Sequence, residues 1–307
     1  HGERVMEGAA VEYLGTLYSD RGRFVESERL YREALAIHQE VQNLELQGVV
    51  SSNLASLLFI SGRSQEARAC YEQALDFHRT EGNRWREGSV LGNLGTLLSE
   101  MGEEEGALEC YRRALDIHRE VGNRTREGVV LGNLGSHFIT HGDWDRARQY
   151  LEEALAIHRS RNNRKSESFC LGNLSELHLL QGDLNRALET VDECMTACQE
   201  SHNTTGGAFF LSTKALILAR MGEPEAAHGL VQEAEALMRE KGHPRGLGRV
   251  LCRRGQLEHL SGLAEKAREL LEEARAIAEQ LQVRPGTEFH KEIVDLEDLL
   301  SGSSSSH

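Results

Sequence analysis

The sequence predicts an all-α solenoid, built from repeated pairs of helices rather than around one globular core. Glycine recurs every 40 residues without insertion or deletion, at Gly22, Gly62, Gly102, Gly142, Gly182, Gly222 and Gly262. Each unit between these glycines contains two amphipathic stretches whose apolar residues have helical spacing. Aromatic residues make up only 5% of the chain, which disfavours a β-sandwich or barrel. A fixed period of this size indicates stacked units that bury surface only against their neighbours.

Each unit is predicted to contain a first and a second helix. The periodic glycine ends the first helix, because a left-handed residue is least costly as glycine. An acidic residue then suits the start of the second helix through capping and the helix dipole, at Glu103, Asp143, Asp183 and Glu223. Residues 1–283 therefore divide into seven units, at about 4–43, 44–83, 84–123, 124–163, 164–203, 204–243 and 244–283.

Small residues recur where the two helices of a unit must approach closely. One row is alanine at Ala67, Ala107, Ala147, Ala187, Ala227 and Ala267, and a larger apolar row, beginning at Tyr31, Tyr71 and Tyr111, lies beside it. This pattern resembles the tetratricopeptide repeat (TPR) over residues 4 to about 281, with a period of 40 rather than the usual 34 residues. The segment GNLG at 92–95 is similar to repeats of kinesin light chain and Pins-type adaptors, and similar arrays occur in bacterial signalling proteins. The resemblance implies a right-handed α-α superhelix whose first helices line the concave side.

The two ends of the array differ. Residues 285–300 are predicted to form a capping helix, with one apolar face for the last unit and one polar face for water. Residues 301–307 look like a tail or tag remnant. The amino end begins inside a first helix without a cap, so we expect self-association there or contact with a domain upstream of residue 1.

Composition narrows the classes of partner and compartment. The formal net charge of -14 argues against nucleic acid and against an anionic membrane surface as partners. The chain has no apolar run long enough to span a membrane, and its amino end does not resemble a signal peptide. Its six cysteines follow no disulfide framework, which favours a cytoplasmic protein. No catalytic motif is present, so we expect neither an enzyme nor a cofactor.

The resemblance places an asparagine row on the concave side. The groove-facing positions include Asn53, Asn93, Asn133 and Asn173, with Gly92, Gly132 and Gly172 beside them and Ser136 in a neighbouring row. An Asn amide pairs with a peptide carbonyl and a peptide N–H together, and glycine lets a backbone come close. Phe169 and Phe209 are the main apolar candidates. In the families that this chain resembles, such asparagines clamp an extended partner. The alternative is that they bond to the neighbouring repeat and stiffen the array.

Two other periodic rows have simpler interpretations. His38, His78, His118 and His158 recur at 40 residues, but zinc ligands must lie within about 2.1 Å of one ion, and successive helices are about 8–10 Å apart. We therefore interpret them as packing residues and expect no metal. Arg84, Arg124 and Arg164 each precede a glutamate by three residues, which predicts weak exposed pairs. The alternative is that these arginines form, with Arg86, Arg126 and Lys165, a basic rim for an acidic partner.

The sequence thus predicts a protein–protein interaction module that binds an extended peptide in its concave groove through the asparagine row. Thr213 and Arg253 replace asparagine in the sixth and seventh units, so we expect binding to weaken there. Two alternatives are a self-associating scaffold and the regulatory sensor region of a larger kinase or ATPase.

Overall fold

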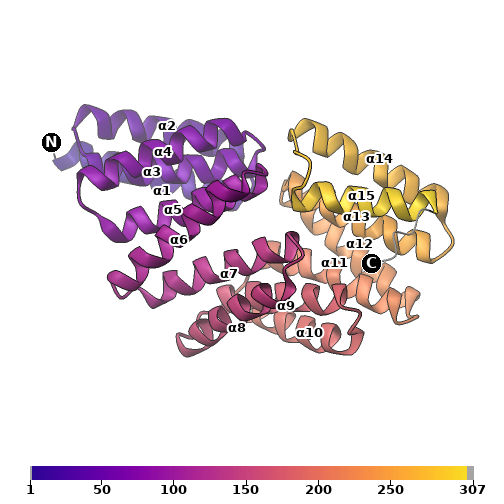
Figure 1. The fold of residues 1–307 in the computed structure, drawn as a ribbon. Coiled ribbons are helices and arrows are strands. Elements are labelled where there is room, and N and C mark those ends of the chain that lie inside the picture. The colour runs from indigo at the N-terminus through magenta and orange to yellow at the C-terminus, as the bar shows by residue number, and fades with distance from the viewer. Residues whose placement is uncertain (1, 303–307) are drawn as a thin grey trace. The chain divides into compact units, whose positions relative to one another are not determined.

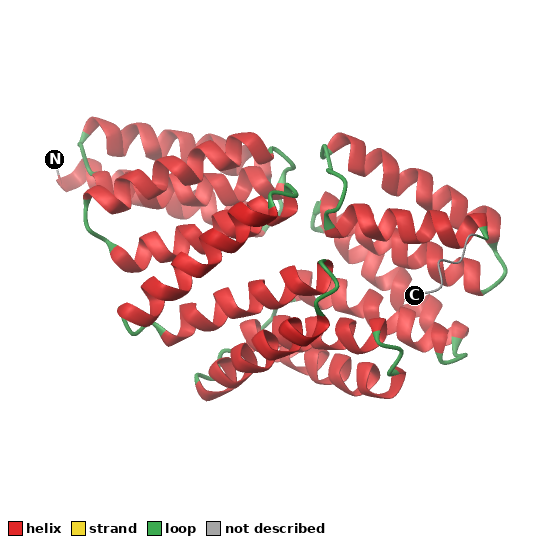
Figure 2. Ribbon diagram, viewed as in Figure 1, coloured by secondary structure: helices red, strands yellow, loops and turns green. Residues whose placement is uncertain are grey.

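The described part of the chain, residues 2–302 of a computed structural model, consists of fifteen helices joined by turns, and it contains no strand (Figure 2). The predicted all-α class and the pairing of helices are therefore confirmed. The helices are α1 Gly2–Asp20, α2 Phe24–Glu40, α3 Leu44–Ile60, α4 Ser64–Thr80, α5 Arg84–Glu100, α6 Glu104–Glu120, α7 Arg124–Thr140, α8 Trp144–Ser160, α9 Arg164–Leu180, α10 Leu184–Glu200, α11 Thr204–Arg220, α12 Pro224–Glu240, α13 Pro244–Leu260, α14 Ala264–Gln280 and α15 Glu288–Ser301.

The helices group into two compact units, residues 1–127 and 128–307, and the division falls within α7. In the first unit, α1, α3 and α5 each pack against the helix that follows, and they also contact one another in succession (Figure 1). In the second unit, α9, α11, α13 and α15 form the corresponding succession, with α10, α12 and α14 beside them. Within each unit, the first helices of the repeats thus share one face. None of the described helices has both the length and the apolar character needed to cross a membrane.

The repeated element is a 17-residue helix followed by a three-residue turn. All helices from α2 to α14 have this length, the turns between α1 and α14 have three residues, and the middle residue of each of these turns has a positive φ. Residues 281–287, between α14 and α15, form a longer connection whose second residue, Gln282, also has a positive φ. After the first helices this residue is always the periodic glycine, with φ between 71° and 89°. After the second helices it is glycine only at Gly82, Gly122 and Gly242, and otherwise Gln42, Asn162, His202 or Gln282 at φ 51–55°. The backbone therefore repeats every 20 residues, although the sequence shows a period of 40.

Helix capping follows side-chain length. Asp143 and Asp183 accept hydrogen bonds from the backbone N–H groups three residues later, as predicted. Glu103 and Glu223 do not, so the prediction of acidic capping is wrong at these two positions. Asparagine and aspartate are among the preferred N-cap residues, whereas glutamate is not. The first helices are capped instead by asparagine side chains, at Asn43, Asn83, Asn123, Asn163 and Asn203.

The histidine row packs inside the repeats. His38, His78, His118 and His158 are at most 1% exposed. Each ring lies against a glycine of the preceding first helix, where a Cβ atom would come within 2.5–2.9 Å of the ring, at Gly8, Gly48, Gly88 and Gly128. The glycine is required because the imidazole occupies the space of its side chain. Burial lowers the pKa of these histidines, and that of His118 to about 4.

The predicted capping helix exists as α15, and its apolar face is buried as expected. Phe289, Ile293 and Leu296 pack against Leu251 and Leu271 of the last helix pair. The expectation that its polar face meets only water is wrong, because Glu288 and Glu292 form ion pairs with an arginine of α13. Most of the predicted tail, residues 303–307, lies outside the described residues.

Replacing Gln42 by glycine should stabilise the protein. A left-handed conformation costs a non-glycine residue about 1–2 kcal/mol, and the added freedom of glycine in the unfolded chain offsets about 0.4–1 kcal/mol of this gain. We expect Gln42→Gly to raise the free energy of unfolding in urea by about 0.5–1 kcal/mol. Asn162→Gly is the matched control and should gain less, because asparagine tolerates this conformation better. A loss of stability in Gln42→Gly would contradict the argument.

Stability should fall on acidification because of the buried histidines. Their folded pKa lies below the ordinary value of about 6.5, so the unfolded state binds protons first as the pH falls. The stabilisation from keeping these histidines neutral is complete above pH ~6.5 and is lost progressively toward pH ~4. His118 alone should lower the free energy of unfolding by about 2 kcal/mol between pH 7 and pH 5. The free energy of unfolding of His118→Leu should therefore decrease less between pH 7 and pH 5 than that of the wild type. As a control, His202→Gln at an exposed position should show the same decrease in the free energy of unfolding as the wild type. If His118→Leu also shows the wild-type decrease, the buried histidine is not its cause.

Candidate functional site

In the first unit, the two predicted asparagines differ in their surroundings. The amide nitrogen Nδ2 of Asn53 in α3 donates to Oε1 of Glu12 in α1 at 3.0 Å. Burial raises the pKa of Glu12, although Arg86 and the bond from Asn53 oppose this. Asn93 in α5 is exposed. The alternative of bonding between repeats therefore describes Asn53, whereas Asn93 presents its amide to solvent.

In the second unit, Asn133 and Asn173 also differ. Asn133 in α7 is half-buried and lines a pocket. Asn173 in α9 is only 5% exposed, and its Nδ2 donates to the backbone oxygen of Phe169, one turn earlier, at 2.8 Å. One donor of Asn173 is therefore used within its own helix.

The predicted glycines take part in packing. Gly92 in α5 is buried. A Cβ atom at Gly132 would lie 3.5 Å from the ring of Phe169 and from Sγ of Cys170, which is ordinary contact. At Gly172 it would lie 2.1 Å from the ring of Phe210, so no side chain fits there. Gly172 thus lets the next first helix approach, a role that the sequence analysis did not foresee.

The row that contains Ser136 has a structural function in the first unit. The hydroxyl groups of its members there share hydrogen bonds with tyrosines of the second helices at 2.9–3.2 Å, in the pairs Thr16–Tyr31, Ser56–Tyr71 and Thr96–Tyr111. In the fourth repeat, Leu151 stands at the tyrosine position. Ser136 therefore lacks the tyrosine partner that holds its counterparts.

Three predicted site residues meet at one pocket in the second unit, which we name the Phe169 pocket. Its volume is about 230 Å³. It is lined by Gly128, Val129, Gly132 and Asn133 of α7, His158 of α8, Lys165, Ser166, Phe169 and Cys170 of α9, and Asn203 of the turn before α11. Phe169 is 37% exposed, so its ring is accessible from solvent. The pocket combines an aromatic wall, a glycine-lined side and an asparagine amide.

Phe209, the other predicted aromatic residue, is covered. The guanidinium carbons of Arg249 and Arg253 lie 4.3 and 4.1 Å from the centre of its ring. Cation–π stacking of this kind is favourable at such distances. Phe209 therefore supports the two arginines rather than presenting its ring to a ligand.

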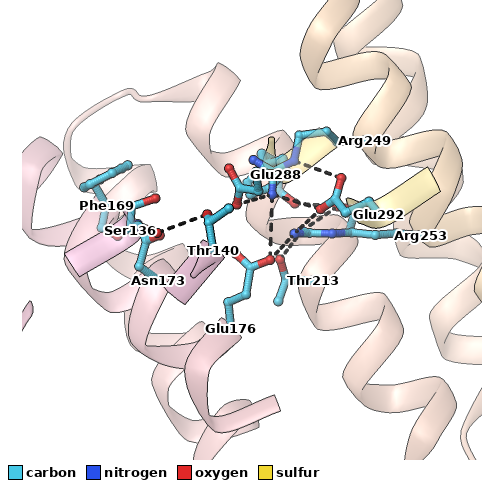
Figure 3. A network of polar contacts seen from close by, with 12 residues as sticks. Ser136, Thr140, Phe169, Asn173, Glu176, Thr213, Arg249, Arg253, Glu288 and Glu292 are labelled. Atoms are coloured by element: carbon cyan, nitrogen blue, oxygen red, sulfur yellow. Dashed lines mark hydrogen bonds and ion pairs between the residues drawn. The ribbon is translucent and has the colours of Figure 1, made fainter. Parts of the chain in front are cut away.

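These arginines belong to an ion cluster with Glu176, Glu288 and Glu292 (Figure 3). Arg253 donates to Glu176 at 2.7 Å, to Glu292 at 3.2 Å and to the hydroxyl of Thr213. Arg249 donates to both carboxylate oxygens of Glu292 at 2.9 Å and to Glu288 at 2.6 Å. The cluster joins α9, α11, α13 and α15 within the second unit.

The charges in this cluster are mutually stabilised. Burial would lower the pKa of Arg249, but the carboxylates of Glu288 and Glu292 outweigh it and hold the pKa well above its usual value. Lys291 of α15 also donates to the backbone oxygen of Thr140, at the end of α7. The sequence indicated that the asparagine row changes to Thr213 and Arg253 in the sixth and seventh repeats. It did not indicate that the side chains of these two residues form a hydrogen bond with each other.

A second set of ion pairs occurs at the junctions between repeats. Glu87, Glu127 and Glu167 are each at most 5% exposed, so the prediction of weak exposed pairs is wrong. Each carboxylate is held by the predicted arginine at 2.6–2.8 Å and by another from the preceding helix at 2.8–3.0 Å, namely Arg79, Arg119 and Arg159. The recurring His-Arg step of the second helices was the signal for this second arginine. Because these arginines bind glutamates of their own chain, they contribute little to a basic rim.

Comparison with known proteins supports the same fold. A tetratricopeptide repeat family model matches residues 7–80 and 86–160. A Rap protein complexed with Competence and Sporulation Factor is similar with a TM-score of 0.72 and 19% identity, over 88% of this chain and 75% of that chain. BtubC (BKLC) from P. vanneervenii has a TM-score of 0.51 and 27% identity, over 66% and 89%. No curated protein matches the sequence significantly.

A further similar structure is the Signal Transduction ATPase with Numerous Domains (STAND) protein with a tetratricopeptide repeat sensor from Pyrococcus horikoshii. Its TM-score is 0.59 and its identity 13%, over 96% of this chain and 46% of that chain. The two segments that match the family model cover the first four predicted repeats, and the same helix length and turn continue through α14. Repeats of this kind are typically interaction modules without catalytic activity. Residues 7–160 therefore contain tetratricopeptide repeats, and the helix pairs that follow have the same fold.

Proposed function

We propose that this protein binds an extended peptide segment of a partner protein along the face formed by its first helices. The observation that carries the proposal is the Phe169 pocket, where Gly132, Asn133 and Phe169 lie together in the second unit. An asparagine amide beside an aromatic wall offers backbone hydrogen bonds and an apolar contact to the same peptide. The Rap protein of similar fold, which forms a complex with a factor, is compatible with a binding role.

The exposure and position of the asparagines divide their proposed roles. Asn93 is exposed in the first unit and Asn133 lines the pocket of the second, so each is the proposed main contact within its own unit. Asn53 and Asn173 would have to give up bonds to Glu12 and to the Phe169 backbone before their Nδ2 groups could donate to a peptide. A net hydrogen bond contributes about 0.5–1.5 kcal/mol. Since micromolar binding needs about 8 kcal/mol, the asparagines alone are insufficient and side-chain pockets must supply the remainder.

The two alternatives predict different behaviour. A self-associating scaffold would show a mass that rises with protein concentration in light scattering, without any added peptide. The regulatory sensor region of a larger kinase or ATPase would instead bind a segment of its own parent chain at the same face. The oligomeric state therefore distinguishes the scaffold from partner binding, and the source of the bound peptide distinguishes the regulatory region.

The double variant Asn93→Ala/Asn133→Ala should lose peptide binding. We expect retention of a randomised pool of extended peptides on the immobilised protein to fall about 10–100-fold, because each asparagine loses one or two hydrogen bonds. Asn53→Ala is the matched control and should change retention less, since its amide already bonds to Glu12. Unchanged retention in the double variant, with an unchanged melting temperature, would exclude the asparagine contacts.

A further inference from the structure

We infer that the Phe169 pocket selects a peptide in which one apolar side chain is flanked by acidic residues. This inference rests on the proposed function and names the class of peptide that the site would take. The occupant is a single side chain such as leucine, with a carboxylate within two residues of it.

The size and walls of the pocket fit one apolar side chain. Its volume of about 230 Å³ is smaller than the roughly 300–1,000 Å³ of sites that enclose a small-molecule ligand. Phe169 and Val129 supply apolar surface, and Gly128 and Gly132 add no side chains that would fill the space. Because Phe209 lies beneath two arginines, Phe169 is the predicted aromatic residue whose ring remains accessible.

The charge at the rim is positive. Lys165 is the one lining residue with a formal charge, since burial lowers the pKa of His158 and leaves it neutral at pH 7. Among the described residues, Lys165 forms no ion pair, whereas nearby Glu167 is held between Arg159 and Arg164 at 3.0 and 2.8 Å. Lys165 and Phe169 are four residues apart, so they share one face of α9. A peptide whose apolar side chain contacts Phe169 therefore meets an unpaired cation beside it.

This combination is particular to the fifth repeat. The positions that correspond to Lys165 and Phe169 hold Trp85 and Ser89 in the third repeat, and Thr125 and Val129 in the fourth. The net charge of -14 would repel an acidic peptide at long range. Charges are screened beyond about 8 Å at physiological ionic strength, so the local cation outweighs distant carboxylates.

The experiment compares peptide pools on the immobilised full chain. One pool has a central leucine flanked by Gly, Ser and Asp, a second has the same leucine flanked by Gly, Ser and Lys, and a third has a central alanine with the acidic flanks. We expect the Leu/Asp pool to be retained about two- to fivefold more than the Leu/Lys pool, as for an exposed charge pair. It should exceed the Ala/Asp pool about tenfold or more, as for burial of a large apolar side chain.

Variants of exposed residues make the test specific. Lys165→Glu should reverse the preference between the Asp and Lys pools, and Phe169→Ala should remove the preference for leucine over alanine. Arg112→Glu, in α6 of the first unit, makes the same change in net charge at an exposed position and should leave both preferences intact. The thermal unfolding of each variant shows whether it is folded.

The outcomes separate this inference from the proposed function. If the protein retains a fully randomised pool but does not distinguish the Asp from the Lys flanks, the pocket inference is wrong and the proposed function stands. The inference also fails if Lys165→Glu keeps the wild-type preference. If the wild type retains no pool at all, both are wrong.

Discussion

The three-residue turn with a left-handed middle residue is the constraint on which the rest of the structure depends. It follows helices of one length, 17 residues from α2 to α14, so equivalent side chains recur at equivalent places. This is why each histidine of the 40-residue row meets a glycine, and why the hydroxyl groups of Tyr31, Tyr71 and Tyr111 each meet a threonine or serine. One residue more within a helix would rotate the side chains that follow it by about 100° around the helix axis and separate these pairs.

Much of this scaffold was predictable, because its signals are local. The glycines at 40-residue spacing correctly indicated where first helices end, and alanine rows indicated close packing. The turns after second helices were harder to predict, since Gln42, Asn162, His202 and Gln282 adopt the left-handed conformation without the residue type that usually indicates it. The asparagine row was visible in the sequence, but whether each amide is already bonded depends on neighbours such as Glu12 and the Phe169 backbone. Periodicity identifies a position on a helix and does not reveal the partners of its side chain.

Buried ion pairs explain how an acidic chain uses its arginines. The glutamates at three repeat junctions would be costly to bury alone, and two arginines each compensate that cost. At the carboxyl end, Glu288 and Glu292 of α15 do the same for Arg249 and Arg253. Each of the three junction glutamates is thereby held by an arginine at the end of the preceding helix as well as by one at the start of its own helix. These ion pairs also leave few cations unpaired for a partner.

The candidate site is distinguished by a cation that these ion pairs leave unpaired. A uniform repeat explains the fold, but it gives no reason for one part of the face to bind differently from another. The differences arise where the repeat changes: Leu151 stands where Ser136 would otherwise meet a tyrosine, and Phe169 and Lys165 stand where other repeats carry different side chains. The next aromatic residue along the face, Phe209, is covered by the arginines that α15 holds in place. An accessible ring and an unpaired lysine therefore coincide at the Phe169 pocket, and selectivity should be concentrated there because the surrounding charges are already satisfied within the chain.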